Sequence, residues 1–253
     1  MDLSAQTVLV TGAGRGLGAA IARAVAQAGA RVVINYRQSR QQAEALAHEL
    51  GPLAVALQAD VTDAAQVQAM LREANEHLGL PVTSVVNNAL ADFSFDGDAR
   101  PALGNIRWER FQHQIDGALK GALNTMQAAL PAMREAGVGR IVNIGTNLVQ
   151  NPVVPYHDYT ASKAALLSLT RTAAQDLGPD GITVNMVSGG LLRTTDASAS
   201  TPAEVFDLIA SLTPLRRVTT PQEFADAVLF FLSPWARAVT GQNLVVDGGL
   251  VKN

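Results

Sequence analysis

The chain has 253 residues, 48% of them hydrophobic, and a formal charge of −3 at pH 7. This length suits one large α/β domain or two small ones. A charge so near zero, with no basic stripe, argues against nucleic-acid binding, and the lack of cysteine excludes disulfides, thiolate metal sites and a cysteine nucleophile. The first residues lack a signal-peptide pattern, and no apolar run reaches the roughly 18 residues of a membrane helix. We therefore expect a cytoplasmic globular protein.

Short β-branched runs alternate along the chain with longer alanine-rich segments of helical period. In chain order the sequence predicts strand 7–12, helix 16–28, strand 31–36, helix 39–50, strand 53–60, helix 63–78, strand 83–89, helix 108–135, strand 139–146, helix 159–177, strand 182–190, helices 203–211 and 221–232, and strand 243–249. The strands are continuous apolar runs, which is typical of strands that helices cover on both faces. Repeated β-α units favour an α/β fold with a doubly wound parallel sheet of about seven strands. Nothing between 1 and 253 reads as an interdomain linker, so we expect one domain.

A glycine-rich turn joins the first predicted strand to the first predicted helix. The segment TGAGRGLG, residues 11–18, places Gly12, Gly16 and Gly18 at this junction. Glycine lets the backbone turn tightly and lets a pyrophosphate approach the N–H groups at the helix start, where the dipole favours an anion. The spacing differs from G-x-G-x-x-G, and close strand–helix packing also requires glycine. The turn alone is therefore a weak indication of dinucleotide binding.

The end of the second strand distinguishes between the two nicotinamide cofactors. An acidic residue near this position holds the ribose hydroxyl of NAD in dinucleotide folds, but here the strand ends in Asn35, Tyr36 and Arg37. Arg15 lies inside the glycine turn. Two guanidinium groups suit a 2′-phosphate because the planar fork binds phosphate oxygens in pairs. We predict NADP(H), with Arg37 as a solvated helix-start residue the alternative interpretation.

A tyrosine and a lysine stand close together in VPYHDYTASKAALL, residues 154–167. Tyr159 and Lys163 are four residues apart, so a helix places them on one face. A free phenol has a pKa of about 10, which makes it a poor proton shuttle at neutral pH. An ammonium about 4 Å away would favour the phenolate by roughly 4 kcal/mol at an effective dielectric near 20, before desolvation opposes it. Tyr156 lacks a lysine four residues on and is the less suitable acid. An exposed helix face is the alternative interpretation of the pair.

Five motifs in order carry a resemblance to a known family. They are TGAGRGLG at 11–18, ADV at 59–61, NNA at 87–89, YTASK at 159–163 and ITVNMVSGGLLRT at 182–194. With them the chain resembles, nearly end to end, a short-chain dehydrogenase/reductase, and it is most similar to the bacterial 3-oxoacyl-acyl-carrier-protein reductase group. The resemblance implies one Rossmann-type domain over 1–253, a homotetramer and the catalytic residues Thr146, Tyr159 and Lys163. It further implies that Asp60 and Val61 hold the adenine, that Asn87 lines the cofactor groove and that Thr194 reaches the nicotinamide amide. Together with the turn and the strand end, it gives the cofactor-binding residues Gly12, Arg15, Gly16, Leu17, Gly18, Tyr36, Arg37, Asp60, Val61, Asn87, Ala89, Tyr159, Lys163, Gly190, Leu192 and Thr194.

Four positions depart from the family pattern. The family's serine, thirteen residues before the tyrosine, is Thr146 here, which keeps the hydroxyl but adds a methyl and restricts χ1. Leu90 replaces the glycine of NNAG, and Ala118 stands where many members have a proton-relay asparagine. Gly189 replaces the usual proline, which predicts a looser loop after that strand. We expect an unusual substrate or a slower enzyme.

The resemblance implies NADPH-dependent reduction of a carbonyl, with a 3-oxoacyl thioester of acyl carrier protein or coenzyme A as the substrate and a place in fatty acid biosynthesis. A Ser/Thr-rich opening followed by an apolar helix predicts a lid at 191–217. Arg216 and Arg217 in it suit an acidic carrier protein or a coenzyme A phosphate, with a charged surface turn as the alternative interpretation. An alcohol or sugar dehydrogenase, an epimerase or dehalogenase on the same scaffold, and a cofactor-binding protein with little catalysis remain open. Trp108 and Trp235 read as packing residues, and no cluster of side chains predicts a metal.

Overall fold

The sheet at the centre of the molecule is fully parallel. A computed structural model of the chain describes residues 2–93, 95–97, 99–193, 195, 198–199 and 201–252. Seven strands pair in the order β3-β2-β1-β4-β5-β6-β7. They are β1 (Thr7–Val10), β2 (Arg31–Tyr36), β3 (Ala54–Gln58), β4 (Ser84–Asn87), β5 (Gly139–Thr146), β6 (Ile182–Gly189) and β7 (Asn243–Val246). The predicted fold class is confirmed.

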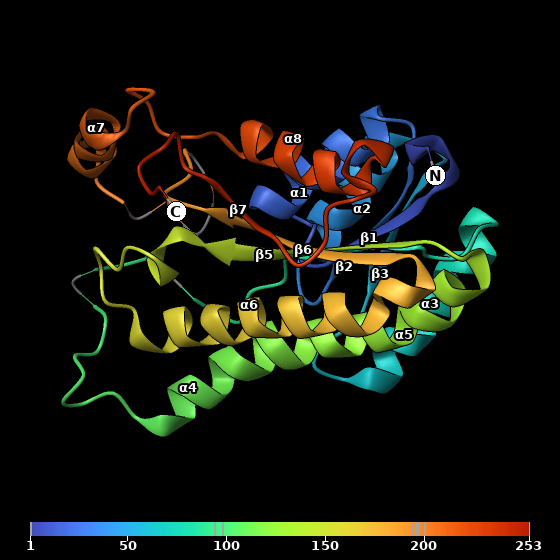
Figure 1. The fold of residues 1–253 in the computed structure, drawn as a ribbon, viewed down its shortest axis with the longest axis horizontal. Helices are drawn as coiled ribbons and strands as arrows, with labels where there is room; N and C mark the ends of the chain where they lie inside the picture. The colour runs from blue at the N-terminus through green and yellow to red at the C-terminus, as the bar shows by residue number, and fades with distance from the viewer. Residues whose placement is uncertain are drawn as a thin grey trace.

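Helices lie on both faces of this sheet (Figure 1). On one side are α1 (Gly16–Gln27), α2 (Arg40–Leu50) and α8 (Pro221–Leu232), and on the other are α3 (Ala64–Leu78), α5 (Gly121–Ala136) and α6 (His157–Leu177). The short α4 (Trp108–Ile115) packs beside α6, and α7 (Ala203–Leu212) stands beyond the end at which strand β5 finishes.

Two apolar cores form because successive strand residues point to opposite faces of the sheet. Val8 and Val10 pack into the core under α1 and α8, which contains Phe224. Leu9, between them, packs into the opposite core with Met126 of α5 and Leu166 of α6. Burial on both faces explains why the strands read as unbroken apolar runs.

The strand order sets where a ligand crevice lies. The chain builds β1, β2 and β3 outward in one direction and then returns to place β4 on the other side of β1. In open parallel sheets the loops at the carboxyl ends separate at such a reversal and leave a crevice. The glycine turn follows β1, and Asn88 and Ala89 follow β4, so the candidate site lies at this junction.

The predicted helix 108–135 is interrupted. A π-helical turn, Asp116–Lys120, separates α4 from α5. A Cβ atom on Gly117 would lie 2.6 Å from the Cβ of Ala91, and one on Gly121 would lie 2.8 Å from Cγ2 of Val61. The glycines let this segment approach the loops after β4 and β3, and a π turn interrupts a helix at just such functional places. The helical periodicity of the sequence did not predict this π turn.

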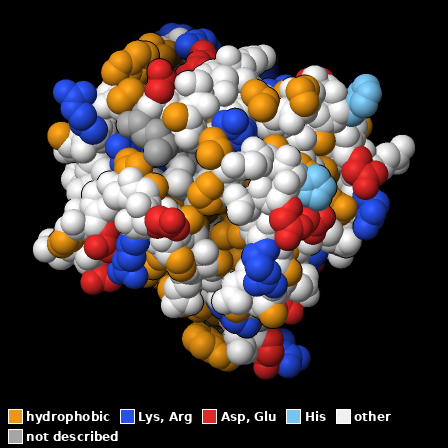
Figure 2. Space-filling model, turned by 90° about the vertical axis from the view of Figure 1, so that its right-hand side faces the viewer, with side chains coloured by type: hydrophobic (Ala, Val, Ile, Leu, Met, Phe, Trp, Pro, Cys, Tyr) orange, Lys and Arg blue, Asp and Glu red, His pale blue; other side chains and the backbone are white. Residues whose placement is uncertain are grey.

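The end of the molecule opposite α7 faces the viewer in Figure 2. Lysine and arginine side chains there are interspersed with aspartate and glutamate. None of the helices in the described part of the chain combines the length and the apolar character that a membrane span requires. Trp108 and Trp235 were expected to be packing residues, and this was wrong, because 67% and 80% of their surfaces are exposed.

Candidate active site

The glycine turn lies directly against the loop after β4. Gly12 and Gly16 have φ of +62° and +57°, a region that favours glycine. A Cβ on Gly12 would lie 3.0 Å from the Cα of Ala89, and one on Gly18 would lie 2.6 Å from Nδ2 of Asn88. The turn therefore needs glycine both for its backbone conformation and for its close approach to the neighbouring loop.

The turn leads into the N-terminus of α1. The cap residue Arg15 makes no side-chain cap hydrogen bond, so the first N–H groups of the helix point toward the crevice without a side-chain acceptor from the cap. Leu17 is partly buried against the core behind them. This arrangement suits a phosphate, as the sequence predicted.

Hydrogen bonds from Thr11 tie the ends of β1 and β4 together. Its hydroxyl accepts from the backbone N–H groups of Asn88 and Ala89, both at 2.9 Å, and the Asn88 amide donates to the Thr11 carbonyl at 2.9 Å. Sequence reasoning missed Thr11 and Asn88. Asn87 was predicted to line the cofactor groove; its amide donates to Asn143 at 2.9 Å, and it lines a small internal cavity described below.

At the end of β2, Asn35 supports the glycine turn. Its side-chain oxygen accepts from the N–H of Gly12 at 3.2 Å and its amide donates to the Ala59 carbonyl at 3.1 Å. Tyr36 is buried, and its ring faces the guanidinium of Arg40 with 6.0 Å from ring centre to Cζ. An amide that holds the turn thus precedes the position where an NAD-binding fold has its carboxylate.

Arg37 forms an ion pair across the crevice. Its Nη2 donates to both carboxylate oxygens of Asp92, each at 3.1 Å. The exposed side-chain fractions are 41% for Arg37 and 74% for Asp92. This partner comes from the loop after β4, and sequence reasoning did not foresee it.

The predicted adenine-binding pair follows β3. Oδ1 of Asp60 accepts from the N–H and the hydroxyl of Thr62 at 2.9 and 2.7 Å. The Val61 carbonyl accepts from the amide of Asn124 at 2.8 Å. Both residues are therefore held at the crevice edge by local contacts.

The three predicted catalytic side chains come together at the carboxyl end of β5. Thr146 is the last residue of β5, and its hydroxyl is hydrogen-bonded to Tyr159 of α6. One helical turn on, the Lys163 amine donates to the Ile144 carbonyl at 2.7 Å and lies 5.9 Å from the centre of the Tyr159 ring. All three are buried, with 3% to 5% of each residue's surface exposed. The predicted common face of Tyr159 and Lys163 is confirmed.

Burial dominates the protonation of this pair. It raises the pKa of Tyr159 to about 12, and the hydrogen bond with Thr146 opposes the rise. It lowers the pKa of Lys163 to about 8. The charge of Lys163 favours the tyrosinate and desolvation opposes it, and in this structure desolvation prevails.

Aromatic rings surround the tyrosine. Phe93 stacks on the Tyr159 ring with centres 4.6 Å apart and an angle of 19°, and Phe95 meets the same ring edge-on at 5.3 Å. Tyr156 contacts both phenylalanines, at 5.3 and 5.7 Å. We call Phe93, Phe95, Tyr156 and Tyr159 the aromatic cluster. Its sequence signal is FSF at 93–95, a few residues after the predicted strand 83–89.

A cavity of about 210 Å³ lies beside this cluster. Phe93, Tyr156 and His157 line it, together with an ion pair between Arg110 of α4 and the buried Asp158, 3.1 Å apart. This geometry places polar and aromatic side chains within reach of one face of the candidate site.

Comparison with known proteins identifies the family. A short-chain dehydrogenase family model, described as enoyl-(acyl carrier protein) reductase, matches residues 12–251. The chain belongs to the short-chain dehydrogenase/reductase family. It is therefore an oxidoreductase that acts on alcohol or carbonyl groups.

Relatives and solved structures in this family match almost end to end. A 3-oxoacyl-acyl-carrier-protein reductase of Staphylococcus aureus is 35% identical, over 97% of this chain and 98% of its own length. The crystal structure of a putative gluconate dehydrogenase from Agrobacterium tumefaciens has a TM-score of 0.88 at 30% identity, covering 98% of this chain and 97% of its own. A metagenomic blue fluorescent protein, crystallised in complex with NADPH, has a TM-score of 0.86 at 35% identity, covering all of both chains.

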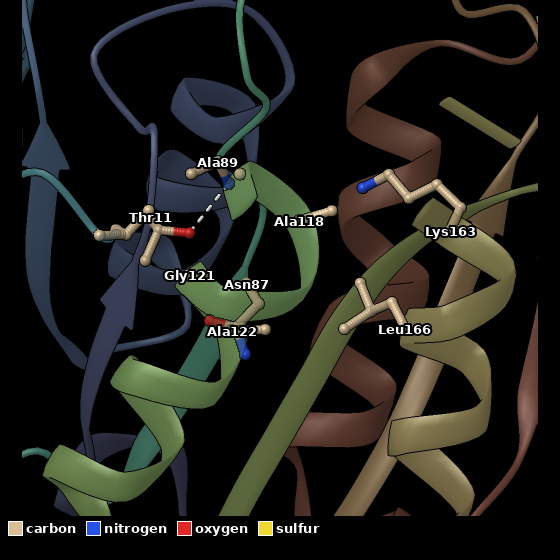
Figure 3. Close-up of a pocket in the computed structure, with 10 residues that line it drawn as sticks. Thr11, Asn87, Ala89, Ala118, Gly121, Ala122, Lys163 and Leu166 are labelled. Atoms are coloured by element: carbon tan, nitrogen blue, oxygen red, sulfur yellow. Dashed lines mark hydrogen bonds between the residues drawn. The ribbon is translucent and has the colours of Figure 1, made fainter. Parts of the chain in front are cut away.

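Two departures from the short-chain dehydrogenase/reductase pattern have a visible structural context. Ala118 lines a cavity of about 10 Å³ together with Thr11, Asn87 and Lys163, which has room for about one water molecule. Figure 3 shows the amine of Lys163 directed toward Ala118 across this space. The nearby Asn124 donates to the Val61 carbonyl.

Around Gly189 the chain is tightly packed. A Cβ there would lie 2.9 Å from Cε2 of Phe224, and one on Gly190 would lie 2.9 Å from Nδ2 of Asn147. Leu192 is buried and pairs with Thr219 in a short parallel bridge. Packing thus accounts for both glycines. The predicted nicotinamide contact Thr194 lies outside the described residues.

Proposed function

We propose that the protein is an NADPH-dependent carbonyl reductase that converts a 3-oxoacyl thioester, on acyl carrier protein or coenzyme A, to the 3-hydroxyacyl form. The observation that carries this proposal is that the side chains of Thr146, Tyr159 and Lys163 lie together, buried, at the end of β5. Two hydroxyl donors that meet at one point suit a single carbonyl oxygen on which charge develops. The Staphylococcus aureus relative supports the substrate class, and the neighbour crystallised with NADPH supports the cofactor.

The crevice residues fit a phosphorylated dinucleotide. Gly12 and Gly18 let the turn lie directly against the loop after β4, and the start of α1 offers backbone donors. Arg37 offers a guanidinium for the 2′-phosphate, with Arg15, Asp60 and the other predicted residues around it. When bound there, NADPH supplies the hydride.

The protein's own residues supply the proton and hold the substrate. Because its pKa is about 12, Tyr159 is protonated at neutral pH and is ready to donate to the substrate oxygen. Thr146 donates the second hydrogen bond. Lys163, with a pKa of about 8, is mostly cationic at pH 7 and stabilises the tyrosinate that remains after the proton has left.

We propose that residues 191–217 cover the bound substrate as a lid within a single domain. In α7, Phe206 is buried and Arg193 lies over its ring at 5.2 Å, while Leu208 is exposed. Arg217 pairs with Glu223 and Arg216 donates to the Ser211 carbonyl, so a carrier protein would have to exchange these partners. A homotetramer, a cytoplasmic location and a role in fatty acid biosynthesis belong to the same proposal.

A substrate panel tests this function. Oxidation of NADPH is followed with acetoacetyl thioester, a simple ketone, a sugar lactone and crotonyl thioester, and each assay is repeated with NADH. The proposal predicts the highest kcat/KM with acetoacetyl thioester and NADPH. The highest kcat/KM with crotonyl thioester would indicate an enoyl reductase, and a preference for the ketone would indicate an alcohol dehydrogenase.

One observation favours a second candidate. Because residue 118 is alanine, Lys163 lies next to a small cavity. Many family members have an asparagine amide at this position. A protein that binds NADPH but turns over slowly with every carbonyl tested would be a cofactor-binding protein with weak catalysis. Calorimetric binding of NADPH together with an empty activity panel would establish that alternative.

A further inference from the structure

Two consecutive residues of the loop after β4 hold two different parts of the site. Asp92 accepts from Arg37 at 3.1 Å through both carboxylate oxygens. Phe93, the next residue, stacks on the ring of Tyr159. One short segment therefore contacts both the proposed 2′-phosphate ligand and the proposed proton donor.

The ion pair spans the crevice. Arg37 directly follows β2, Asp92 follows β4, and β1 lies between those two strands in the sheet. The glycine turn extends from the end of β1. The pair thus joins the two sides of the place where the dinucleotide would bind.

Another anion can replace Asp92 as the partner of Arg37. Both side chains are substantially exposed, and exposed ion pairs are weak. The backbone of Arg37 is held without Asp92, because the Arg37 carbonyl accepts from the Gln58 amide at 2.9 Å and β2 precedes it. A phosphate monoester carries about −1.5 to −2 charges and three acceptor oxygens, whereas Asp92 offers one charge. A 2′-phosphate is therefore the stronger ligand for the same guanidinium.

We propose that Asp92 is a positioning residue that occupies Arg37 until the 2′-phosphate of the cofactor replaces it, and that its release lets Phe93 leave the catalytic tyrosine. This inference rests on the proposed function, in which Arg37 binds that phosphate. A ligand with a 2′-phosphate breaks the ion pair between Arg37 and Asp92, whereas a ligand that has only the 2′-hydroxyl leaves this pair intact. Only the first ligand therefore binds the loop with the pair broken more tightly than the loop with the pair formed. The preference for NADP(H) then has two effects: a higher affinity for this cofactor, and access of the substrate to Tyr159.

A fluorescent label on the loop tests the exchange directly. The chain contains no cysteine, so Ala99→Cys, at an exposed loop position, takes a single environment-sensitive dye. The probes are adenosine 2′,5′-bisphosphate and adenosine 5′-monophosphate, neither of which carries a nicotinamide that would push on the aromatic cluster. Binding of each is measured separately by calorimetry. At saturation the bisphosphate is expected to change the dye emission at least about twofold more than the monophosphate.

Two further substitutions in the labelled protein sharpen the test. Asp92→Ala removes the partner of Arg37 and is expected to give, without ligand, the emission of the bisphosphate-bound parent, and to respond little to either probe. Glu44→Ala is the matched control, because Glu44 pairs with the neighbouring Arg40 and does not belong to the loop. It is expected to respond as the parent does.

The outcomes separate this inference from the proposed function. If calorimetry shows no preference for the bisphosphate, the assignment of Arg37 to the 2′-phosphate is wrong. If the bisphosphate binds more tightly but both probes change the emission equally, the role of Asp92 is wrong while the cofactor assignment stands. An unchanged emission in Asp92→Ala also overturns the role of Asp92.

Discussion

Replacing Lys163 by methionine tests how burial controls this site. Methionine is unbranched and a good helix former, so it removes the charge and keeps most of the packing. Burial lowers the lysine pKa from 10.5 to about 8, and because about 1.4 kcal/mol corresponds to one pKa unit, the charged form destabilises the fold by about 3 kcal/mol at neutral pH. The lost hydrogen bond to the Ile144 carbonyl offsets part of the gain in the variant.

The dependence on pH isolates this effect. Below pH 8 the lysine is protonated in both the folded and the unfolded states, and its burial cost is constant. Between about pH 8 and 10.5 the unfolded chain holds the proton and the folded chain does not, so the stability of the parent rises with pH. The expected rise is about 2–3 kcal/mol between pH 7 and 10 relative to Lys163→Met. Tyr159 is present in both proteins, so the loss of stability that begins near pH 10, where its phenol ionises in the unfolded chain only, cancels in the difference.

Urea unfolding of both proteins at pH 7, 8, 9 and 10, at one protein concentration, gives the difference in the free energy of unfolding. The reasoning predicts a difference that shifts in favour of the parent as the pH rises. A difference that stays constant across the series would show that Lys163 keeps its proton and that burial does not set its pKa.

Three further predictions concern the substrate, the turn and the cofactor. Thr146→Ala should lower kcat at least about tenfold while Thr146→Ser stays near the parent, because only the alanine variant loses the hydroxyl donor; equal turnover of all three would remove Thr146 from the site. Gly12→Ala should weaken NADPH binding measured by calorimetry, since its Cβ would lie 3.0 Å from the Ala89 backbone. Gly51→Ala, also at positive φ but with nothing within 4 Å, should cost about 1–3 kcal/mol of stability through backbone strain and leave the affinity for NADPH unchanged. Arg37→Gln should raise the Kd of NADPH about tenfold and leave that of NADH within about twofold, and equal losses for both cofactors would contradict its phosphate role.

The sequence predicted those features that depend on local pattern. Apolar runs and helical periods gave the order of the elements, because the central strands are buried on both faces and the helices bury one face against the sheet. The glycine turn after β1 and the common helix face of Tyr159 and Lys163 on α6 could be predicted because both are short-range features of the chain.

Contacts between distant loops were not predictable in this way. Arg37 and Asp92 are 55 residues apart, and neither has a neighbour in sequence that indicates the other. The stacking of Phe93 on Tyr159 likewise depends on how the loop after β4 folds back. The burial of Tyr159 raises its pKa, so the charge of a lysine four residues on could not by itself predict the direction of the pKa shift.

Tyr159→Phe tests the central claim most directly, with Tyr156→Phe as the matched control. Both variants remove one hydroxyl and keep both rings in the aromatic cluster. The account predicts that Tyr159→Phe still binds NADPH but loses at least about 100-fold in kcat with the best carbonyl substrate, while Tyr156→Phe keeps most of its turnover. Near-parent turnover of Tyr159→Phe, or an equal loss in both variants, would contradict Tyr159 as the proton donor.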